Sequence, residues 1–196
     1  MGLPYPEAVF TLDYLEEKPE AFYKVAKEYF SYPADPTFAH YFMRKVENNE
    51  QMFLNFTQNI DGLEAKSGMN VDKLIEAHGH TRTAHCSDYE CRKEASLEEY
   101  LKHVEQEKIF RCECGKVIKP DIVFFGESLP DKFVNNVPKI KQGDLVFVMG
   151  TSLKVYPFAA LAHMVGKEVP LVLVNRENPG LKRENFLFME GNIDDQ

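Results

Sequence analysis

Apolar and polar residues follow one another in patterns that predict helices and strands in mixed order. The range Pro19 to Phe30 predicts a helix, because its apolar residues recur at helical spacing and Pro19 suits a first turn. Its apolar face consists of Phe22, Val25, Ala26 and Tyr29. A second predicted helix covers Thr37 to Val46. Its apolar stripe consists of Phe38, Tyr41 and Phe42. A third covers Ser96 to Glu105, where Ser96 and Glu99 have the spacing of a capping box.

Four apolar runs have the length of strands. They are Met52 to Thr57, Ile122 to Phe125, Leu145 to Met149, and Leu171 to Val174. Helical segments or long connections separate them, which favours a mostly parallel sheet. Their apolar character is continuous rather than alternating, as in strands covered on both faces. The pattern therefore predicts an α/β fold.

Polar side chains directly follow the first of these strands. Gln58, Asn59 and Asp61 stand where an open α/β sheet collects its ligand. Asp61 and Glu64 have capping-box spacing, so a helix is expected to begin at Asp61. His78 follows shortly and can move a proton near neutral pH. The alternative interpretation is an ordinary helix cap for Asp61 and a structural role for His78.

The third predicted strand ends in a turn of small residues. Leu145 to Met149 is followed by Gly150, Thr151 and Ser152, and a helix is expected to begin near Pro157. A strand, a small-residue turn and a helix N-terminus together form a corner that binds anions or nucleotides. A plain turn and cap is the alternative.

The four cysteines predict a metal site. They are Cys86, Cys91, Cys112 and Cys114. Two close pairs that bracket a short segment suit tetrahedral coordination of zinc by thiolates. Four thiolates leave no coordination position open, so such a zinc is structural. Two disulfides or free thiols are the alternative. The one-residue gap in the second pair is tight for a zinc ribbon, and His85 or His103 could substitute as a ligand.

Composition narrows the class of protein. The 196 residues, 44% of them hydrophobic, suit one domain or one domain with a small insert. A net charge of -8 argues against nucleic-acid binding by phosphate neutralisation and is compatible with a basic, lysine-bearing partner. No apolar run reaches membrane-spanning length, and Met1-Gly2-Leu3-Pro4 is not a signal peptide. We therefore expect a soluble, intracellular protein that contacts neither nucleic acid nor membrane.

Several motifs together resemble one family, the sirtuins, which are NAD-dependent protein lysine deacylases. The resemblance runs from about Gly2 to Asn185, and the motifs stand in the family's order and spacing. Beside the cysteines they are Leu3-Pro4-Tyr5-Pro6-Glu7-Ala8, Thr57-Gln58-Asn59-Ile60-Asp61, Glu76-Ala77-His78-Gly79, Lys119-Pro120-Asp121-Ile122-Val123-Phe124-Phe125-Gly126-Glu127, Met149-Gly150-Thr151-Ser152-Leu153 and Asn175-Arg176-Glu177. The residues in these motifs are most similar to those of the branch that removes acetyl groups.

The resemblance implies a fold and a division of the chain. It implies a Rossmann-like, mostly parallel sheet with a small zinc-binding insert and a helical module. Residues 5–50 would be the helical segment, 51–80 and 120–185 the Rossmann-like part, and 81–119 the zinc-binding module. The whole chain, 1–196, would be one catalytic core.

The resemblance also implies roles for individual residues. His78 matches the general base that draws a proton from the nicotinamide ribose while the acetyl-lysine oxygen attacks C1′ and nicotinamide leaves. Asn59 matches a second catalytic residue, which with Gln58 orients the ribose and the attacking atoms. The cofactor-binding set is Gln58, Asn59, Ile60, Asp61, Gly150, Thr151, Ser152, Asn175, Arg176 and Glu177. The substrate-binding set is Val123, Phe124, Phe125, Gly126 and Glu127. This strand would pair with the peptide backbone, whereas the alternative is an ordinary buried strand.

The chain departs from the family at both ends. The family opens on a glycine-rich turn, Gly-Ala-Gly-x-Ser, and a loop ending in Pro-Asp-Phe-Arg, and neither occurs here. The segment from Gly191 to Gln196 also lacks the family's last strand. Relative to the family, we expect a chain that lacks the first strand, binds NAD weakly and associates through open sheet edges. The acyl preference is not fixed by this sequence.

The resemblance predicts an NAD-dependent deacetylase that transfers the acetyl group of acetyl-lysine to ADP-ribose. Its partner would be an acetylated protein or peptide, histone or non-histone, in the cytoplasm or the nucleus. One alternative is a zinc-bearing sirtuin-like module that binds lysine-rich partners without turnover. A weaker alternative is a metal-dependent hydrolase that uses His78 and His85 with the cysteines.

Overall fold

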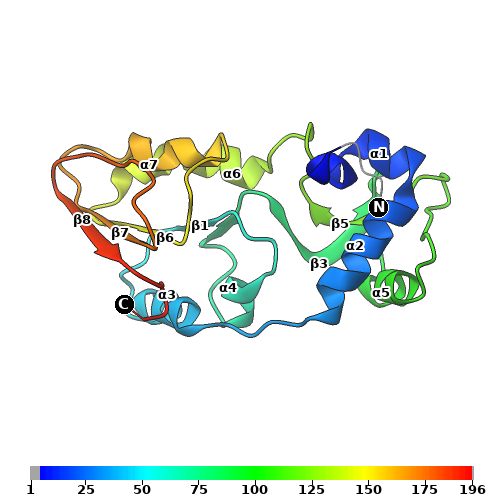
Figure 1. The fold of residues 1–196 in the computed structure, drawn as a ribbon, viewed down its shortest axis with the longest axis horizontal. Helices are drawn as coiled ribbons and strands as arrows, with labels where there is room; N and C mark the ends of the chain where they lie inside the picture. Colours follow the sequence, from blue (N-terminus) through cyan, green and yellow to red (C-terminus); the bar gives the residue numbers. More distant parts are fainter. Residues whose placement is uncertain (1–4, 196) are drawn as a thin grey trace. The chain divides into compact units, whose positions relative to one another are not determined.

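The structure is a computed structural model, and it describes residues 5–195 (Figure 1). Gly2, Leu3, Pro4 and Gln196, which belong to the motifs discussed above, lie outside the described residues. The described chain forms two compact units. Unit 1 contains residues 5–35, 59–63 and 78–130, and unit 2 contains residues 36–58, 64–77 and 131–195.

Unit 1 begins with helices that cover its core. They are η1 (Pro6–Phe10), α1 (Leu12–Glu17), α2 (Pro19–Ser31) and, later in the chain, α5 (Leu97–Glu105). Pro19 stands in the first turn of α2 and the Ser96 hydroxyl accepts a bond from the Glu99 amide at the start of α5, so both predicted helices are confirmed. On α2, Phe22 and Ala26 are buried as predicted, but Tyr29 is exposed. Tyr23 is buried as well, since its hydroxyl donates to the Ile118 carbonyl over 2.8 Å and so satisfies its polar end.

The sheet of unit 1 is antiparallel. It contains β4 (Glu94–Ala95), β3 (Gly79–Cys86) and β5 (Ile118–Ile122), in that order. The predicted strand Ile122 to Phe125 is wrong in its position, because β5 ends at Ile122 and Phe125 makes only an isolated bridge to Thr11. The observed strand begins earlier than predicted. It includes the buried Lys119 and Pro120, whose residue types are depleted in strands, so the apolar pattern did not reveal its start.

Aromatic side chains form much of the unit 1 core. Phe22 and Phe124 meet edge to face with ring centroids 5.2 Å apart, and Tyr23 and Tyr100 meet at 5.8 Å. All four are almost fully buried. Each such side chain contributes roughly 1.5–3 kcal/mol by burial, so this cluster fixes α2 and α5 against the sheet.

Unit 2 contains short helices. They are α3 (Phe38–Asn48), α4 (Leu63–Lys66), α6 (Asp131–Asn136), η2 (Val137–Gln142), η3 (Phe158–Ala160) and α7 (Leu161–Met164). The predicted helix after Thr37 is confirmed as α3, but its stripe of Phe38, Tyr41 and Phe42 is exposed and the buried residues are Ala39 and Glu47. The face with Glu47 lies inward because its carboxylate accepts from the Asn70 amide over 3.1 Å. α7 and η3 follow Pro157, as predicted.

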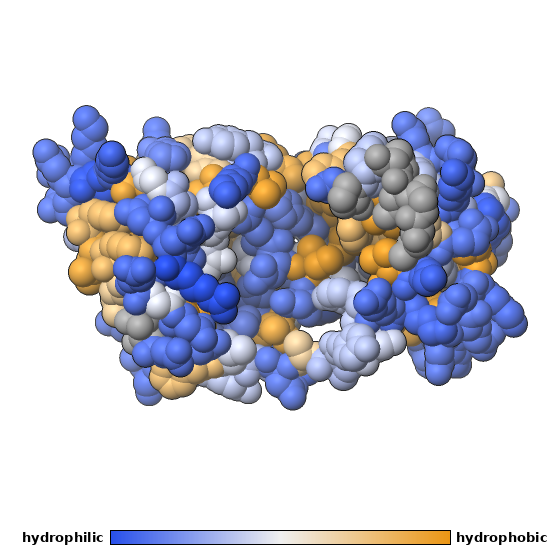
Figure 2. All heavy atoms as spheres, viewed as in Figure 1, coloured by the Kyte–Doolittle hydropathy of each residue, from blue (hydrophilic) through white to orange (hydrophobic). Residues whose placement is uncertain are grey.

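The strands of unit 2 are parallel. β1 (Asn55–Thr57) pairs with β2 (Leu74–Glu76), and a second sheet has the order β6 (Val146–Met149), β7 (Leu171–Asn175) and β8 (Phe186–Glu190). The α/β class and the parallel pairing predicted from the apolar runs are confirmed, although β2, β3, β4 and β8 were not predicted. Apolar side chains reach the surface over β8, where Leu187 is 54% exposed (Figure 2).

Candidate functional site

The segment around His78 is fixed by main-chain contacts within unit 1. The carbonyl oxygen of His78 accepts a bond from the Val123 amide over 2.9 Å. The next residue, Gly79, has φ +74°, and a Cβ atom there would lie 1.9 Å from the carbonyl oxygen of Asp121. Only glycine tolerates both the positive φ and this close approach. The sequence His78-Gly79 therefore holds a half-buried imidazole at a fixed point beside the end of β5.

The polar segment after β1 is held against β3. The carbonyl oxygen of Ile60 accepts from both the amide and the hydroxyl of Thr81, each over 3.2 Å. The Asp61 carboxylate accepts from the Leu63 amide over 3.0 Å, and α4 begins at Leu63, two residues later than predicted. Gly62 separates them with φ +71°, which explains the later start. Asn59 lies exposed on the same segment.

In unit 2, side chains that follow β1, β6 and β7 are joined by hydrogen bonds. The Thr151 hydroxyl donates to the side-chain oxygen of Gln58 over 3.2 Å. The side-chain amide of Asn175 donates to the Thr151 carbonyl over 3.0 Å and to the Glu177 carbonyl over 2.7 Å. The predicted residues after β1, β6 and β7 thus contact one another, at strand ends of the kind where open α/β sheets bind ligands.

Within this cluster the individual roles differ. Asn175 is buried, and its side-chain amide donates to the carbonyls of Thr151 and Glu177. It therefore stabilises the turns after β6 and β7. Arg176, Glu177, Ser152 and Gly150 are exposed at the same edge, and Gly150 has φ +59°. The exposed residues are the ones that a ligand can reach.

The predicted substrate segment follows β5. Phe124 is buried in the unit 1 core, whereas Phe125 is 61% exposed. The Phe125 amide donates to the Phe10 carbonyl over 2.8 Å, and the Val123 amide is bonded to His78. Gly126 has φ +90°, and the Glu127 amide donates to the Phe124 carbonyl over 3.0 Å, so residues 124–127 form a tight turn.

The four cysteines come together in unit 1. Their sulfur atoms all lie within 4.8 Å of one another, with Cys86 to Cys114 at 3.4 Å and Cys91 to Cys112 at 3.7 Å. These separations are too long for S–S bonds, so the disulfide alternative is wrong. Burial raises the pKa of the Cys86 thiol to about 12. A metal ion would replace the proton, and four thiolates suit tetrahedral zinc with no open position.

Neither candidate histidine belongs to the metal cluster. His85 lies 2.7 Å from the Asp121 carboxylate, and His103 stacks on Phe110 with its ring nitrogen 2.8 Å from the Glu99 carbonyl. Within the described residues the clustered ligands are the cysteines alone. A closed four-sulfur site removes the basis for a hydrolase that uses His78 and His85 with the cysteines.

Comparison with known proteins identifies the family. A sequence model of the Sir2 family matches residues 1–157. The chain belongs to the Sir2 family. It is 43% identical over 181 residues to the NAD-dependent protein deacetylase sirtuin-2 of Danio rerio, covering 91% of this chain and 48% of that protein. It is 42% identical over 179 residues to the NAD-dependent protein deacetylase sirtuin-3 of Mus musculus, covering 91% and 53%.

A solved structure agrees with the sequence relatives. A chain described under the structural basis for sirtuin substrate affinity matches this Sir2-family chain with a TM-score of 0.85 and 32% identity. The match covers 95% of this chain and 80% of that one. The Sir2-family chain spans about half the length of the sirtuin-2 and sirtuin-3 relatives that it matches.

Four contacts among the candidate site residues of this Sir2-family chain and their neighbours were not predicted from its sequence. They are the bond from Thr151 to Gln58, the two bonds of the Asn175 amide, and a buried ion pair between Lys119 and Glu127. The sequence contained one signal for the last of these, a lysine three positions before the apolar run that starts at Ile122 and an acid directly after Phe125-Gly126. No helix among the described residues has the length and apolarity needed to cross a bilayer.

Proposed function

We propose that this protein is an NAD-dependent protein lysine deacetylase, which transfers an acetyl group from lysine to ADP-ribose and releases nicotinamide. Family membership supports the reaction class, since the relatives from Danio rerio and Mus musculus are NAD-dependent protein deacetylases. The observation that carries the proposal is the main-chain bond between His78 and Val123. It joins the proposed general base directly to the proposed substrate segment.

The strand-end cluster of unit 2 supports NAD binding. Hydroxyl, amide and carboxylate groups at the ends of parallel strands suit the ribose and phosphate oxygens of a dinucleotide. Exposed Ser152 and Glu177 offer a hydroxyl and a carboxylate, and Asn175 holds the turns that carry them. NAD, when bound, supplies an energetic leaving group, nicotinamide.

The residues of unit 1 around His78 and Asn59 support the proton transfer and the orientation of reactants. His78 is half-buried and on a main chain that Gly79 fixes, and an imidazole is a side chain that can accept a proton from a ribose hydroxyl. Asn59 and Asp61 follow Gln58 directly, and the Ile60 carbonyl holds this segment on Thr81. Fixed polar groups of this kind lower a barrier chiefly by positioning.

The metal-binding cysteines support a structural role. The four thiolates would hold one zinc ion, which closes the two loops at the end of β3 and before β5. Since no coordination position stays open, this zinc takes no part in the reaction.

The remaining parts of the proposal concern partner and place. The substrate is an acetylated lysine on a protein or peptide, either histone or non-histone, and neither nucleic acid nor membrane is a partner. The net charge of -8 is compatible with a lysine-rich substrate. The protein acts inside the cell, in the cytoplasm or the nucleus.

One experiment separates this enzyme from a module that only binds lysine-rich partners. The full-length protein, NAD and an acetyl-lysine peptide are mixed, and free nicotinamide is measured with and without the peptide. Release that depends on the acetylated peptide supports the deacetylase. Peptide binding by calorimetry with no nicotinamide release would support the binding module.

A further inference from the structure

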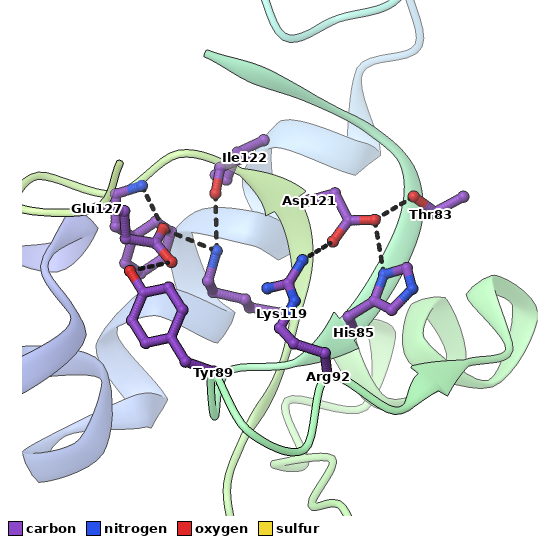
Figure 3. Close-up of polar contacts among 9 residues, drawn as sticks. Thr83, His85, Tyr89, Arg92, Lys119, Asp121, Ile122 and Glu127 are labelled. Carbon is purple, nitrogen blue, oxygen red and sulfur yellow. Dashed lines mark hydrogen bonds and ion pairs between the residues drawn. The ribbon is translucent and has the colours of Figure 1, made fainter. Parts of the chain in front are cut away.

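A buried ion pair stands beneath the turn that the proposed function assigns to substrate binding. Lys119, on β5, is 2% exposed and its ammonium lies 3.1 Å from the Glu127 carboxylate, which is also buried (Figure 3). The same ammonium donates to the Ile122 carbonyl over 2.7 Å and lies 4.5 Å from the centre of the Phe124 ring. One lysine thus contacts the last residue of β5 and the far end of the turn.

The Glu127 carboxylate closes the turn. Its second contact is with the Phe124 amide, which donates to it over 2.6 Å. The Glu127 amide donates in return to the Phe124 carbonyl over 3.0 Å. Both main-chain polar groups of Phe124 are therefore satisfied by Glu127, and the turn between them carries Phe125 and Gly126.

The neighbouring amides are also occupied. The Val123 amide is bonded to the His78 carbonyl and the Phe125 amide to the Phe10 carbonyl. Three main-chain hydrogen bonds, from the amides of Val123, Phe125 and Glu127, hold this segment. The exposed Phe125 side chain and the exposed Gly126 are therefore the parts of the turn that a peptide can reach. The shape of this short tip depends on Lys119 and Glu127.

Burial of the Lys119–Glu127 ion pair costs desolvation free energy. Burial lowers the pKa of Lys119, and the Glu127 carboxylate opposes that shift. Apolar residues of similar volume often replace such pairs with no loss of stability. The pair is therefore explained better by the geometry that it imposes, a fixed distance between β5 and the tip, than by stability.

A second polar cluster lies around Asp121 on the same strand. The Asp121 carboxylate accepts from the Thr83 hydroxyl and contacts His85 at 2.7 Å and Arg92 at 3.4 Å (Figure 3). Lys119 and Asp121 stand two positions apart on β5. The strand that carries Lys119 is itself fixed, so the lysine can position the turn.

We propose that Lys119 and Glu127 are positioning residues for substrate: their ion pair sets the tip Phe125–Gly126 at the position at which it meets the peptide around the acetylated lysine. The inference rests on the proposed deacetylase function. It assigns the pair to peptide affinity and not to the chemistry at NAD.

The test uses Lys119→Met and Glu127→Gln in the full-length protein, with steady-state kinetics in peptide and in NAD. Each variant should raise the peptide KM by roughly tenfold, while kcat and the KM for NAD stay within about threefold. The double variant should cost about as much as either single one, because both remove the same interaction. Lys102→Met is the matched control, since Lys102 makes only an exposed pair with Glu98 on α5, and its peptide KM should not change.

Folding is controlled separately. Glu127→Gln keeps the shape of the side chain and an oxygen that can accept from Phe124, so it serves if Lys119→Met fails to fold. Hydrogen exchange at the Phe124 and Glu127 amides should be faster in the variant, with the global thermal midpoint unchanged. A peptide KM equal to that of the parent in folded Glu127→Gln, or a loss of kcat with KM unchanged, would overturn the inference. A parent protein with no deacetylation at all would instead overturn the proposed function.

Discussion

The amide of Val123 donates to the carbonyl oxygen of His78 over 2.9 Å, and Gly79 follows at φ +74°. This contact ties the one half-buried imidazole of the predicted catalytic motif to the segment predicted to meet the substrate. It makes the position of His78 a property of the main chain. Substitution of the imidazole should therefore change the chemistry and leave the surrounding backbone in place.

His78→Ala should lower kcat for deacetylation by about a hundredfold or more, because the variant lacks the proposed general base. Its thermal midpoint and its affinity for NAD should change little. The measurement is steady-state turnover with calorimetry of NAD binding on the full-length protein. His163→Ala is the control, as His163 is exposed on α7, away from every predicted site residue in the sequence. Equal turnover in the parent and in His78→Ala would reduce His78 to a structural histidine.

Gly79→Ala should destabilise unit 1. A methyl group there would lie 1.9 Å from the Asp121 carbonyl oxygen, so the contact between β3 and β5 must open. Gly180→Ala is the matched control, because Gly180 also has positive φ but no atom within 4 Å of an added Cβ. The control should lose about 1–2 kcal/mol of the free energy of unfolding. The Gly79 variant should lose clearly more in the same denaturant titration, and equal losses would show that the contact is not tight.

The purified protein should contain one zinc ion per chain. Since the ligands are thiols that must lose protons, metal binding should release protons and weaken as the pH falls. Chelation should unfold the segment that carries the cysteines, and Cys112→Ser should lower the zinc content. Ser87→Ala, next to a ligand but with no sulfur, is the control. Metal analysis that finds less than about half an equivalent would contradict the four-sulfur site.

Asn175→Ala should weaken NAD binding with a small effect on kcat. The side-chain amide of Asn175 holds the carbonyls of Thr151 and Glu177, and its loss frees the turns after β6 and β7. Loss of two hydrogen bonds of a buried group predicts roughly a tenfold or greater rise in the dissociation constant of NAD. Asn136→Ala is the control, because Asn136 donates only to the Lys132 carbonyl within its own helix. Unchanged NAD affinity in Asn175→Ala would separate these turns from the cofactor.

Sequence patterns predicted the elements whose stability is local. Helix α2 was predicted because proline and apolar spacing act within the helix itself. Strand β3 was missed because Gly79 to Cys86 has few apolar residues, and its strand conformation depends on pairing with β5. β5 was placed too late because Lys119 looks like a surface residue until Glu127, eight positions away, provides its partner. Such long-range contacts leave no periodic signal.

The candidate site divided in the same way. Motif spacing predicted a set of candidate residues, and the structure brings the cysteines together and joins Gln58, Thr151 and Asn175. Motif spacing did not predict that the side-chain amide of Asn175 donates to the carbonyls of Thr151 and Glu177. Nor did the apolar pattern predict that the apolar stripe of α3 would be exposed while Glu47 lies on the buried face.

The most direct test of the account measures two products in one reaction. Full-length, zinc-loaded protein is incubated with NAD and an acetyl-lysine peptide, and free nicotinamide and deacetylated peptide are quantified over time. The account predicts equal amounts of the two products, no nicotinamide without acetylated peptide, and loss of both in His78→Ala. Deacetylation that proceeds without NAD, or nicotinamide release that ignores the peptide, would contradict it.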